Sequence, residues 1–172
     1  MSSKKNIKRG FSLAEILVYI GILLAMLAVI FNILIGISKS RDSLNTAQNI
    51  SFSALSAIDR IEREVHLASS VNTSASTLAT SPGVLVLDGL DNNGNPRSVE
   101  FSIIADELHF KENGVDKGAL TDNKTRVSSL TFNRLATSTA EAVRIEMTLE
   151  SGVQSKLKRE TFYTTALMRQ SL

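Results

Sequence analysis

An unbroken run of uncharged, mostly apolar residues near the start of the chain most constrains what it can fold into. The run covers residues 16–38, which is 23 residues without Asp, Glu, Lys or Arg. As a helix rising about 1.5 Å per residue, it would span roughly 34 Å, enough for a bilayer core of about 30 Å. Four basic residues precede it, whereas Lys39 and Arg41 follow. The sequence predicts one membrane span with the N-terminus in the cytoplasm.

This run has two ordinary explanations. A secretory signal peptide fits poorly, because the run exceeds the usual 7 to 15 residues and no Ala-x-Ala site follows it. A plain signal anchor explains the length and the basic flank, but it does not explain Glu15, which lies directly before the run. A carboxylate costs about 2.5 to 3.5 kcal/mol at mid-bilayer and less near the interface. We therefore expect Glu15 to have a partner on another chain.

The residues around Glu15 resemble a known processing motif. The stretch Lys8-Arg9-Gly10 is followed by Phe11-Ser-Leu-Ala-Glu15 and then by the apolar run. This order is similar to the cleavage and methylation motif of type IV prepilins and type II secretion prepseudopilins. The resemblance implies that a membrane-embedded aspartic peptidase cuts after Gly10, that Phe11 becomes the N-methylated first residue, and that Glu15 guides assembly. The implied partners are other pilin or pseudopilin subunits, the prepilin peptidase and an inner-membrane assembly platform.

Cleavage at this site has a physical consequence for charge. It would place a new ammonium group on Phe11 at the membrane edge, where Glu15 of a neighbouring subunit can pair with it. A buried charge left without its partner costs about 3 to 5 kcal/mol, so this pair would set the register between subunits. The leader, residues 1–10, carries four of the 19 basic residues, which leaves 15 against 17 acidic ones and a formal charge of −2. Nucleic acid is therefore not an expected partner.

The rest of the chain has the size of one domain and few candidates for chemistry. About 130 residues follow the apolar run, enough for a single core. The absence of cysteine excludes disulfides, cysteine catalysis and thiolate metal sites. No Ser/His/Asp arrangement, phosphate loop or nucleotide fingerprint is present. We therefore expect a chain that is not an enzyme and that uses no cofactor.

Beyond the membrane run the helix is expected to continue to about Ser70. Its apolar residues advance by three or four positions and form one stripe, which predicts packing on a sheet. Asp59 and Arg63 form a favourable i,i+4 pair on the polar side. The predicted stripe consists of Leu44, Ala47, Ile50, Ala54, Ile58, Ile61, Val65 and Ala68.

The sequence pattern of the C-terminal part predicts antiparallel strands. Apolar residues alternate with polar ones around Phe101, Phe132 and Ile145, the corner Ala105-Asp106 predicts a hairpin, and Ser151-Gly152 is an expected turn. Five or six strands in one sheet would cover the helical stripe, giving an α+β fold. The expected segments are 1–10 (leader), 11–38 (transmembrane half of the helix), 39–70 (amphipathic half) and 71–172 (sheet, one globular domain with 39–70).

Stretches beyond the apolar run resemble one subgroup of this family more than the others. The stretch 59–68, the hairpin ending Leu108-His-Phe and the closing 162–169 resemble the J-type minor pseudopilins and W-type minor pilins. The implied fold is the pilin fold, a long N-terminal helix packed by its C-terminal half on an antiparallel sheet. Asn32 stands where many major pilins have a helix-kinking proline, and no C-terminal cysteine pair is present. Both departures fit a minor subunit, which in this family sits near the filament tip.

Few other residues are candidates for binding. Asp88, Asp91 and Asn93 form a weak metal candidate, because they supply oxygen ligands but lack the spacing and closing glutamate of an EF-hand. Asn93-Gly94 is first of all a turn signal. Two histidines, His66 and His109, make no His-rich zinc site. The only later basic cluster is more consistent with a solvated strand edge than with a DNA contact, and it consists of Lys156, Lys158 and Arg159.

Two classes of function follow from the sequence. The favoured one is a structural subunit of a type IV pilus-like filament, exported into the plasma (inner) membrane, processed after Gly10 and extracted into a cell-surface filament. The alternative is a stationary single-pass anchor with an extracytoplasmic module that binds DNA or a secreted substrate. Cleavage separates them, because a stationary anchor needs no cut at Gly10.

Overall fold

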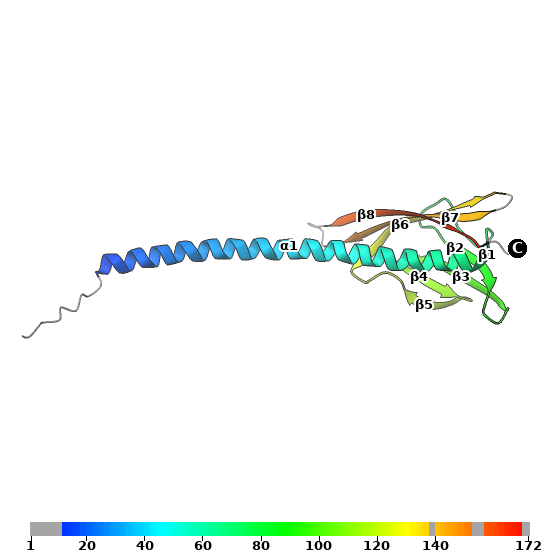
Figure 1. The fold of residues 1–172 in the computed structure, drawn as a ribbon, viewed down its shortest axis with the longest axis horizontal. Helices are drawn as coiled ribbons and strands as arrows, with labels where there is room; N and C mark the ends of the chain where they lie inside the picture. Colours follow the sequence, from blue (N-terminus) through cyan, green and yellow to red (C-terminus); the bar gives the residue numbers. More distant parts are fainter. Residues whose placement is uncertain (1–11, 138–139, 153–156, 170–172) are drawn as a thin grey trace, which may run out of the picture. The chain divides into compact units, whose positions relative to one another are not determined.

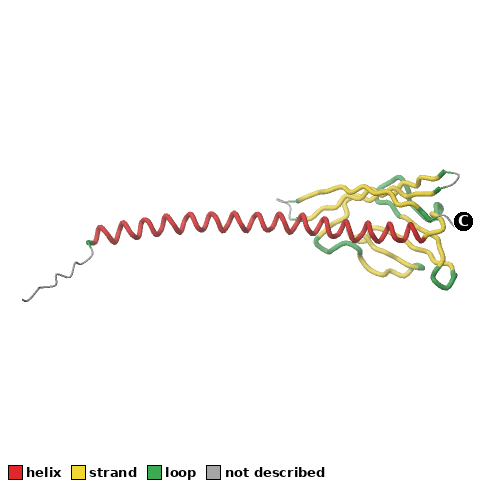
Figure 2. Tube along the Cα trace, viewed as in Figure 1, coloured by secondary structure: helices red, strands yellow, loops and turns green. Residues whose placement is uncertain are grey.

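The computed structural model describes residues 12–137, 140–152 and 157–169, and the chain divides into two compact units, Met1–Asp42 and Ser43–Leu172. The described residues contain one helix, α1 (Leu13–Leu67), and eight strands (Figures 1 and 2). An apolar N-terminal helix together with antiparallel sheets confirms the predicted α+β class.

The strands form two antiparallel sheets rather than the one sheet that was predicted. The first has the order β1-β2-β3-β4-β5, and the second has the order β6-β7-β8. Together they contain more strands than the five or six expected, because β1 and β5 are short and lack the alternating burial that identified the others. The strands are β1 (Ala68–Val71), β2 (Leu85–Leu90), β3 (Pro96–Ile104), β4 (Glu107–Glu112), β5 (Val115–Ala119), β6 (Thr125–Ala136), β7 (Glu141–Ser151) and β8 (Lys158–Leu167).

The helix ends three residues earlier than predicted. Leu67 is its last residue, and the next residue, Ala68, already belongs to β1, which pairs with β2. Gly89 on β2 lies beside this junction, where an added Cβ would make only ordinary van der Waals contacts, at 3.4 Å from the Leu67 carbonyl oxygen and 3.5 Å from the Ala68 Cα. From Ala68 onward, backbone groups that could have extended the helix instead form hydrogen bonds with β2. This strand pairing determines where α1 ends.

One core holds the Ser43–Leu172 unit together. One face of α1 and the inner faces of both sheets bury their apolar side chains in a single cluster. In Figure 1 the second sheet is seen above this part of α1, and β4 and β5 are seen below it. The predicted helical stripe is confirmed from Ile50 to Val65, with Ile58 only partly buried. Ala68 is buried but lies on β1, and Leu44 is 61% exposed and was wrongly included. The helix also buries Ala57, which the predicted stripe omitted.

Strand alternation was predicted well where one face of a strand is buried. Phe101 and Phe110 lie on neighbouring strands with ring centroids 5.6 Å apart. On β7 every second residue from Val143 to Leu149 is buried, and Phe132 on β6 is fully buried. These side chains form the sheet half of the core.

The predicted hairpin at Ala105-Asp106 is confirmed. Ile104 pairs with Glu107 across a two-residue turn in which Ala105 and Asp106 have φ of 50° and 67°. Two positive φ values in a two-residue connection define a type I′ turn, for which asparagine and glycine are the favoured residues. Alanine gains no side-chain hydrogen bond that would offset its left-handed backbone, so the turn carries a small conformational cost.

Ala105→Asn should therefore raise the free energy of unfolding by about 0.5 to 1 kcal/mol, because asparagine tolerates the left-handed region that this turn requires. The melting temperature followed by circular dichroism measures the gain. Ala75→Asn is the matched control, because Ala75 is also exposed in a turn but is not among the residues with positive φ. An equal rise in both variants would contradict the backbone explanation.

Candidate functional site

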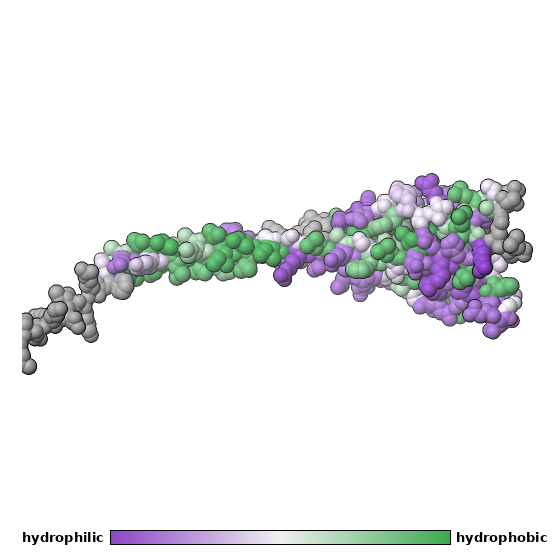
Figure 3. Space-filling view, in the orientation of Figure 1, coloured by the Kyte–Doolittle hydropathy of each residue, from purple (hydrophilic) through white to green (hydrophobic). Residues whose placement is uncertain are grey.

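The first part of α1 is apolar on all sides. Leu13–Ser38, 26 residues that contain an 18-residue window of mean hydropathy 2.8, buries none of its side chains within the chain. Figure 3 shows hydrophobic residues over this segment. At about 1.5 Å per residue it extends roughly 39 Å. By length and composition it can cross a membrane, and a helix that is apolar all round belongs in lipid or among other helices rather than in water.

Glu15 is the only acidic or basic residue between Leu13 and Ser38, and it lies exposed in the first turn of α1. The Ser12 carbonyl oxygen accepts hydrogen bonds from the backbone N–H groups of Glu15 at 3.0 Å and Ile16 at 3.2 Å, so Ser12 begins the helix. The spacing Ser12-x-x-Glu15 is that of a capping box, in which the acidic residue also meets the positive end of the helix dipole.

This local explanation of Glu15 was missed at the level of sequence, although the Ser-x-x-Glu spacing could have revealed it. A favourable charge in the first turn stabilises a helix by about 0.3 to 1 kcal/mol. Burying an unpaired carboxylate deep in lipid costs about 2.5 to 3.5 kcal/mol. Capping therefore explains the helical position of Glu15, but it does not offset burial of its charge within an apolar assembly.

A row of small or amide side chains runs along the apolar segment. The separations between its members are seven, four, three, four and four residues, which place them on one face of a helix. A Cβ added to Gly21 or Gly36 would meet nothing within 4 Å, so no contact within the chain requires glycine there. Small residues allow two membrane helices to approach closely. The members are Ala14, Gly21, Ala25, Ala28, Asn32 and Gly36.

Asn32 gives this face one amide group. Its Nδ2 donates a hydrogen bond of 2.9 Å to the Ala28 carbonyl oxygen one turn earlier. Part of its polarity is therefore satisfied along its own helix, and α1 continues through this position as helix. The predicted cleavage and methylation residues, Gly10 and Phe11, lie outside the described residues.

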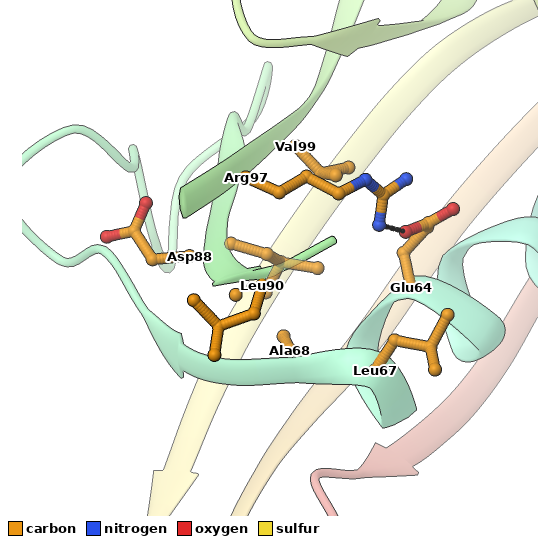
Figure 4. Close-up of a pocket in the computed structure, with 9 residues that line it drawn as sticks. Glu64, Leu67, Ala68, Asp88, Leu90, Arg97 and Val99 are labelled. Atoms are coloured by element: carbon orange, nitrogen blue, oxygen red, sulfur yellow. Dashed lines mark hydrogen bonds and ion pairs between the residues drawn. The ribbon is translucent and has the colours of Figure 1, made fainter. Parts of the chain in front are cut away.

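In the Ser43–Leu172 unit, a buried ion network joins the end of α1 to the first sheet. The Glu64 side chain is only 3% exposed. Its Oε1 accepts a hydrogen bond from Arg60 Nη2 at 2.9 Å, and its Oε2 accepts one from Arg97 Nη1 at 2.6 Å. Arg97 also donates through Nε to Glu112. Figure 4 shows the hydrogen-bonded side chains of Glu64 and Arg97 at one small recess, which Leu67 and Leu90 also line.

The network stabilises its own charged forms. The hydrogen bond from Arg97 to Glu64 raises the pKa of Arg97, and the hydrogen bond from Arg97 lowers the pKa of Glu112. The Arg60 guanidinium lies 4.1 Å from the centroid of the Phe110 ring. Because both oxygens of Glu64 already accept hydrogen bonds, this cluster is a structural junction between helix and sheet. Sequence reasoning missed it, because Arg97 lies 33 residues from Glu64 and no local pattern connects them.

The weak metal candidate is organised as a turn. Asp91 Oδ1 accepts hydrogen bonds from the backbone N–H groups of Asn93 and Asn95, both at 2.8 Å. The Asn95 backbone N–H is the main cause of the lowered pKa of Asp91. Asp88 Oδ2 instead accepts a hydrogen bond from Asn72 Nδ2 at 2.9 Å. In the described ranges, no group of three or more His, Cys, Asp or Glu side chains could hold a metal ion.

The remaining candidates are held by ordinary surface contacts. His66 is exposed near the end of α1, and His109 Nδ1 lies 2.8 Å from Asp116 Oδ2. Lys158 lies 2.8 Å from Glu160, and Arg159 pairs with Glu150. Lys156 lies outside the described residues.

The predicted pair of Asp59 and Arg63 is present as a loose surface contact of 4.0 Å.

No family model, curated protein or solved structure matches the chain. The interpretation of the N-terminal motif therefore depends on the residues themselves and on the geometry of α1.

Proposed function

We propose that this chain is a structural subunit, of the minor pilin or pseudopilin type, of a type IV pilus-like filament. The observation that carries the proposal is the composition of α1. Its first 26 residues are apolar on all sides and contain one carboxylate, Glu15, in the first turn, whereas its later residues belong to the core of an α+β unit. A helix that is only a membrane anchor needs no acidic residue at that position.

The proposed sequence of events begins in the plasma (inner) membrane with the N-terminus in the cytoplasm. A prepilin peptidase removes residues 1–10, Phe11 is methylated, and an assembly platform extracts the mature chain into the filament. Glu15 of one subunit pairs with the Phe11 ammonium of its neighbour, and the row of small side chains that contains Gly21 and Gly36 allows neighbouring helices to pack closely. The pilin fold and the absence of catalytic activity belong to the same proposal.

Intact mass and N-terminal sequence of the protein from its native host test this proposal. Sheared surface filaments and membranes should be analysed separately. A minor subunit should begin at methylated Phe11 in both fractions and should be scarce in filaments. A chain that begins at Met1 and is confined to membranes would instead be a stationary anchor. Gly10→Leu is a useful companion variant, because a bulky residue at the cut should leave Met1 in place, whereas Gly10→Ala can still be processed.

A further inference from the structure

The strand β8 forms an open edge of the second sheet, whose order β6-β7-β8 leaves two edges. The chain itself covers the β6 edge. There the Ala79 N–H donates to the Phe132 carbonyl oxygen at 2.8 Å, and the Gly83 N–H donates to the Leu130 carbonyl oxygen at 2.8 Å. Among the described residues, no segment pairs with the side of β8 that faces away from β7. β8 therefore presents a row of backbone donors and acceptors to its surroundings.

Every second residue of β8 directs its backbone groups to this open side. Met168, directly after β8, donates its N–H to the Glu141 carbonyl oxygen at 2.9 Å, so Met168 faces β7. Along a paired antiparallel strand the backbone groups point alternately to one side and the other. β8 pairs with β7 through its whole length without a register shift. The N–H and C=O groups of Thr161, Tyr163 and Thr165 therefore point away from β7.

This edge lacks the features that normally keep a strand edge unpaired, which are short length, bulges, charged side chains and proline. In the first sheet, the edge strand β1 has four residues. The other edge strand, β5, has five residues, pairs irregularly with β4 and carries Asp116 and Lys117. Residues 161–167 of β8 instead contain no charge, no proline and no glycine. A run of this kind favours pairing with another strand.

Apolar side chains on both faces of β8 are only partly covered. Phe162 packs against the core but is not fully buried. Tyr163 and Leu167, on the opposite face, are 60% and 58% exposed. A strand added beside β8 would cover these side chains while it paired with the backbone. The open edge and the partly covered side chains thus fit the same ligand, an extended polypeptide.

The charges along β8 indicate which side chains this ligand carries. Residues 157–169 contain three basic residues and one acidic residue, Glu160. Arg144 on β7, which pairs with Thr165, and Arg169, just beyond β8, have no carboxylate partner among the described residues. The Arg144 guanidinium instead lies 6.0 Å from the centroid of the Tyr163 ring. Carboxylates on the ligand would complement these cations.

We propose that the β8 edge binds an extended, acidic segment of another protein, which adds a strand to the second sheet. Hydrogen bonds to the main chain of Thr161, Tyr163 and Thr165 give the affinity, and the nearby arginines select an acidic segment. The edge lies in the Ser43–Leu172 unit, so this binding requires neither cleavage after Gly10 nor assembly into a filament.

Hydrogen exchange of the full-length chain in detergent tests the strand addition. The probe is a synthetic peptide of alternating valine and glutamate, long enough to span β8, and the control peptide has lysine in place of glutamate. The glutamate peptide should protect the outward amides of Thr161, Tyr163 and Thr165 from exchange. The lysine peptide should bind at least about tenfold more weakly, because it meets like charges. No gain in protection, or equal binding of the two peptides, would overturn the proposal.

Thr165→Pro removes one outward N–H and no hydrogen bond to β7, and proline is accepted on strand edges. This variant should lose the protection given by the glutamate peptide, whereas Thr165→Val, which keeps the N–H, should retain it. Circular dichroism checks that the variant is folded, and the two peptides with the unaltered chain decide the proposal without it. Full protection in a folded Thr165→Pro chain would overturn strand addition.

Photo-cross-linking in the native host identifies what occupies the edge. Benzoylphenylalanine in place of Tyr163 should cross-link to an acidic segment of another protein, and Thr165→Pro should abolish that product. A cross-link only to a second copy, a product unaffected by Thr165→Pro, or no product would overturn the proposal. A chain that begins at Phe11 but binds nothing at β8 would refute the docking edge and leave the filament function standing.

Discussion

Replacing Glu15 with glutamine should leave the chain in the membrane and reduce its incorporation into filaments by about a hundredfold or more. Glutamine can replace glutamate in a capping box, so the start of α1 should be preserved. What is lost is the charge that, in the proposed filament, pairs with the Phe11 ammonium of the neighbouring subunit. An uncompensated buried charge costs about 3 to 5 kcal/mol, and each 1.4 kcal/mol corresponds to a factor of ten.

The measurement is the fraction of the chain recovered in sheared filaments relative to membranes. Ser12→Ala is the matched control, because it removes the side chain at the start of α1 but keeps the Glu15 charge. If Ser12→Ala lowers incorporation as much as Glu15→Gln, helix capping explains Glu15. Normal incorporation of Glu15→Gln would remove the assembly role altogether.

Glu64→Ala should lower the free energy of unfolding of the Ser43–Leu172 unit by about 3 to 5 kcal/mol. The substitution removes the carboxylate that accepts hydrogen bonds from both Arg60 and Arg97, and Glu64 is almost fully buried. Arg97 keeps Glu112 as a partner, which places the expected loss toward the lower end of this range.

Chemical unfolding of the full-length chain in detergent, followed by circular dichroism, measures this loss. Asp59→Ala is the control on the same helix. Its partner Arg63 is 4.0 Å away and both side chains are largely exposed, so it should change stability by about 0.5 kcal/mol or less. Similar losses in the two variants would show that the buried network contributes no more than a surface pair.

The sequence predicted those parts of the fold that depend on neighbouring residues. The apolar run and the Ala105-Asp106 turn are features of consecutive residues, and β3, β6 and β7 show a period of two because one side of each strand is buried. β5 has no fully buried residue, so its sequence shows no alternation of apolar and polar residues that would predict a strand. The division into two sheets depends on contacts between distant segments, which period-two patterns do not encode.

The candidate site was predictable to a similar extent. The position of Glu15 was evident from the sequence, because a carboxylate beside an apolar run stands out in any chain. The exposure of Leu44 was not predicted, since Leu44 was assigned to the core stripe. Deciding which apolar side of a helix is covered requires knowing where the sheets lie. Gly10 and Phe11 remain predictions from the motif alone.

The direct passage from α1 into β1 has a mechanical consequence. Leu67 is followed by the first strand residue without an intervening linker. Tension applied along the later part of the helix would therefore reach the first sheet with no slack to take up. The Glu64–Arg97 pair and the β1–β2 ladder would resist that tension together, so the unit should yield cooperatively at a single force rather than by gradual peeling of the helix from its sheets.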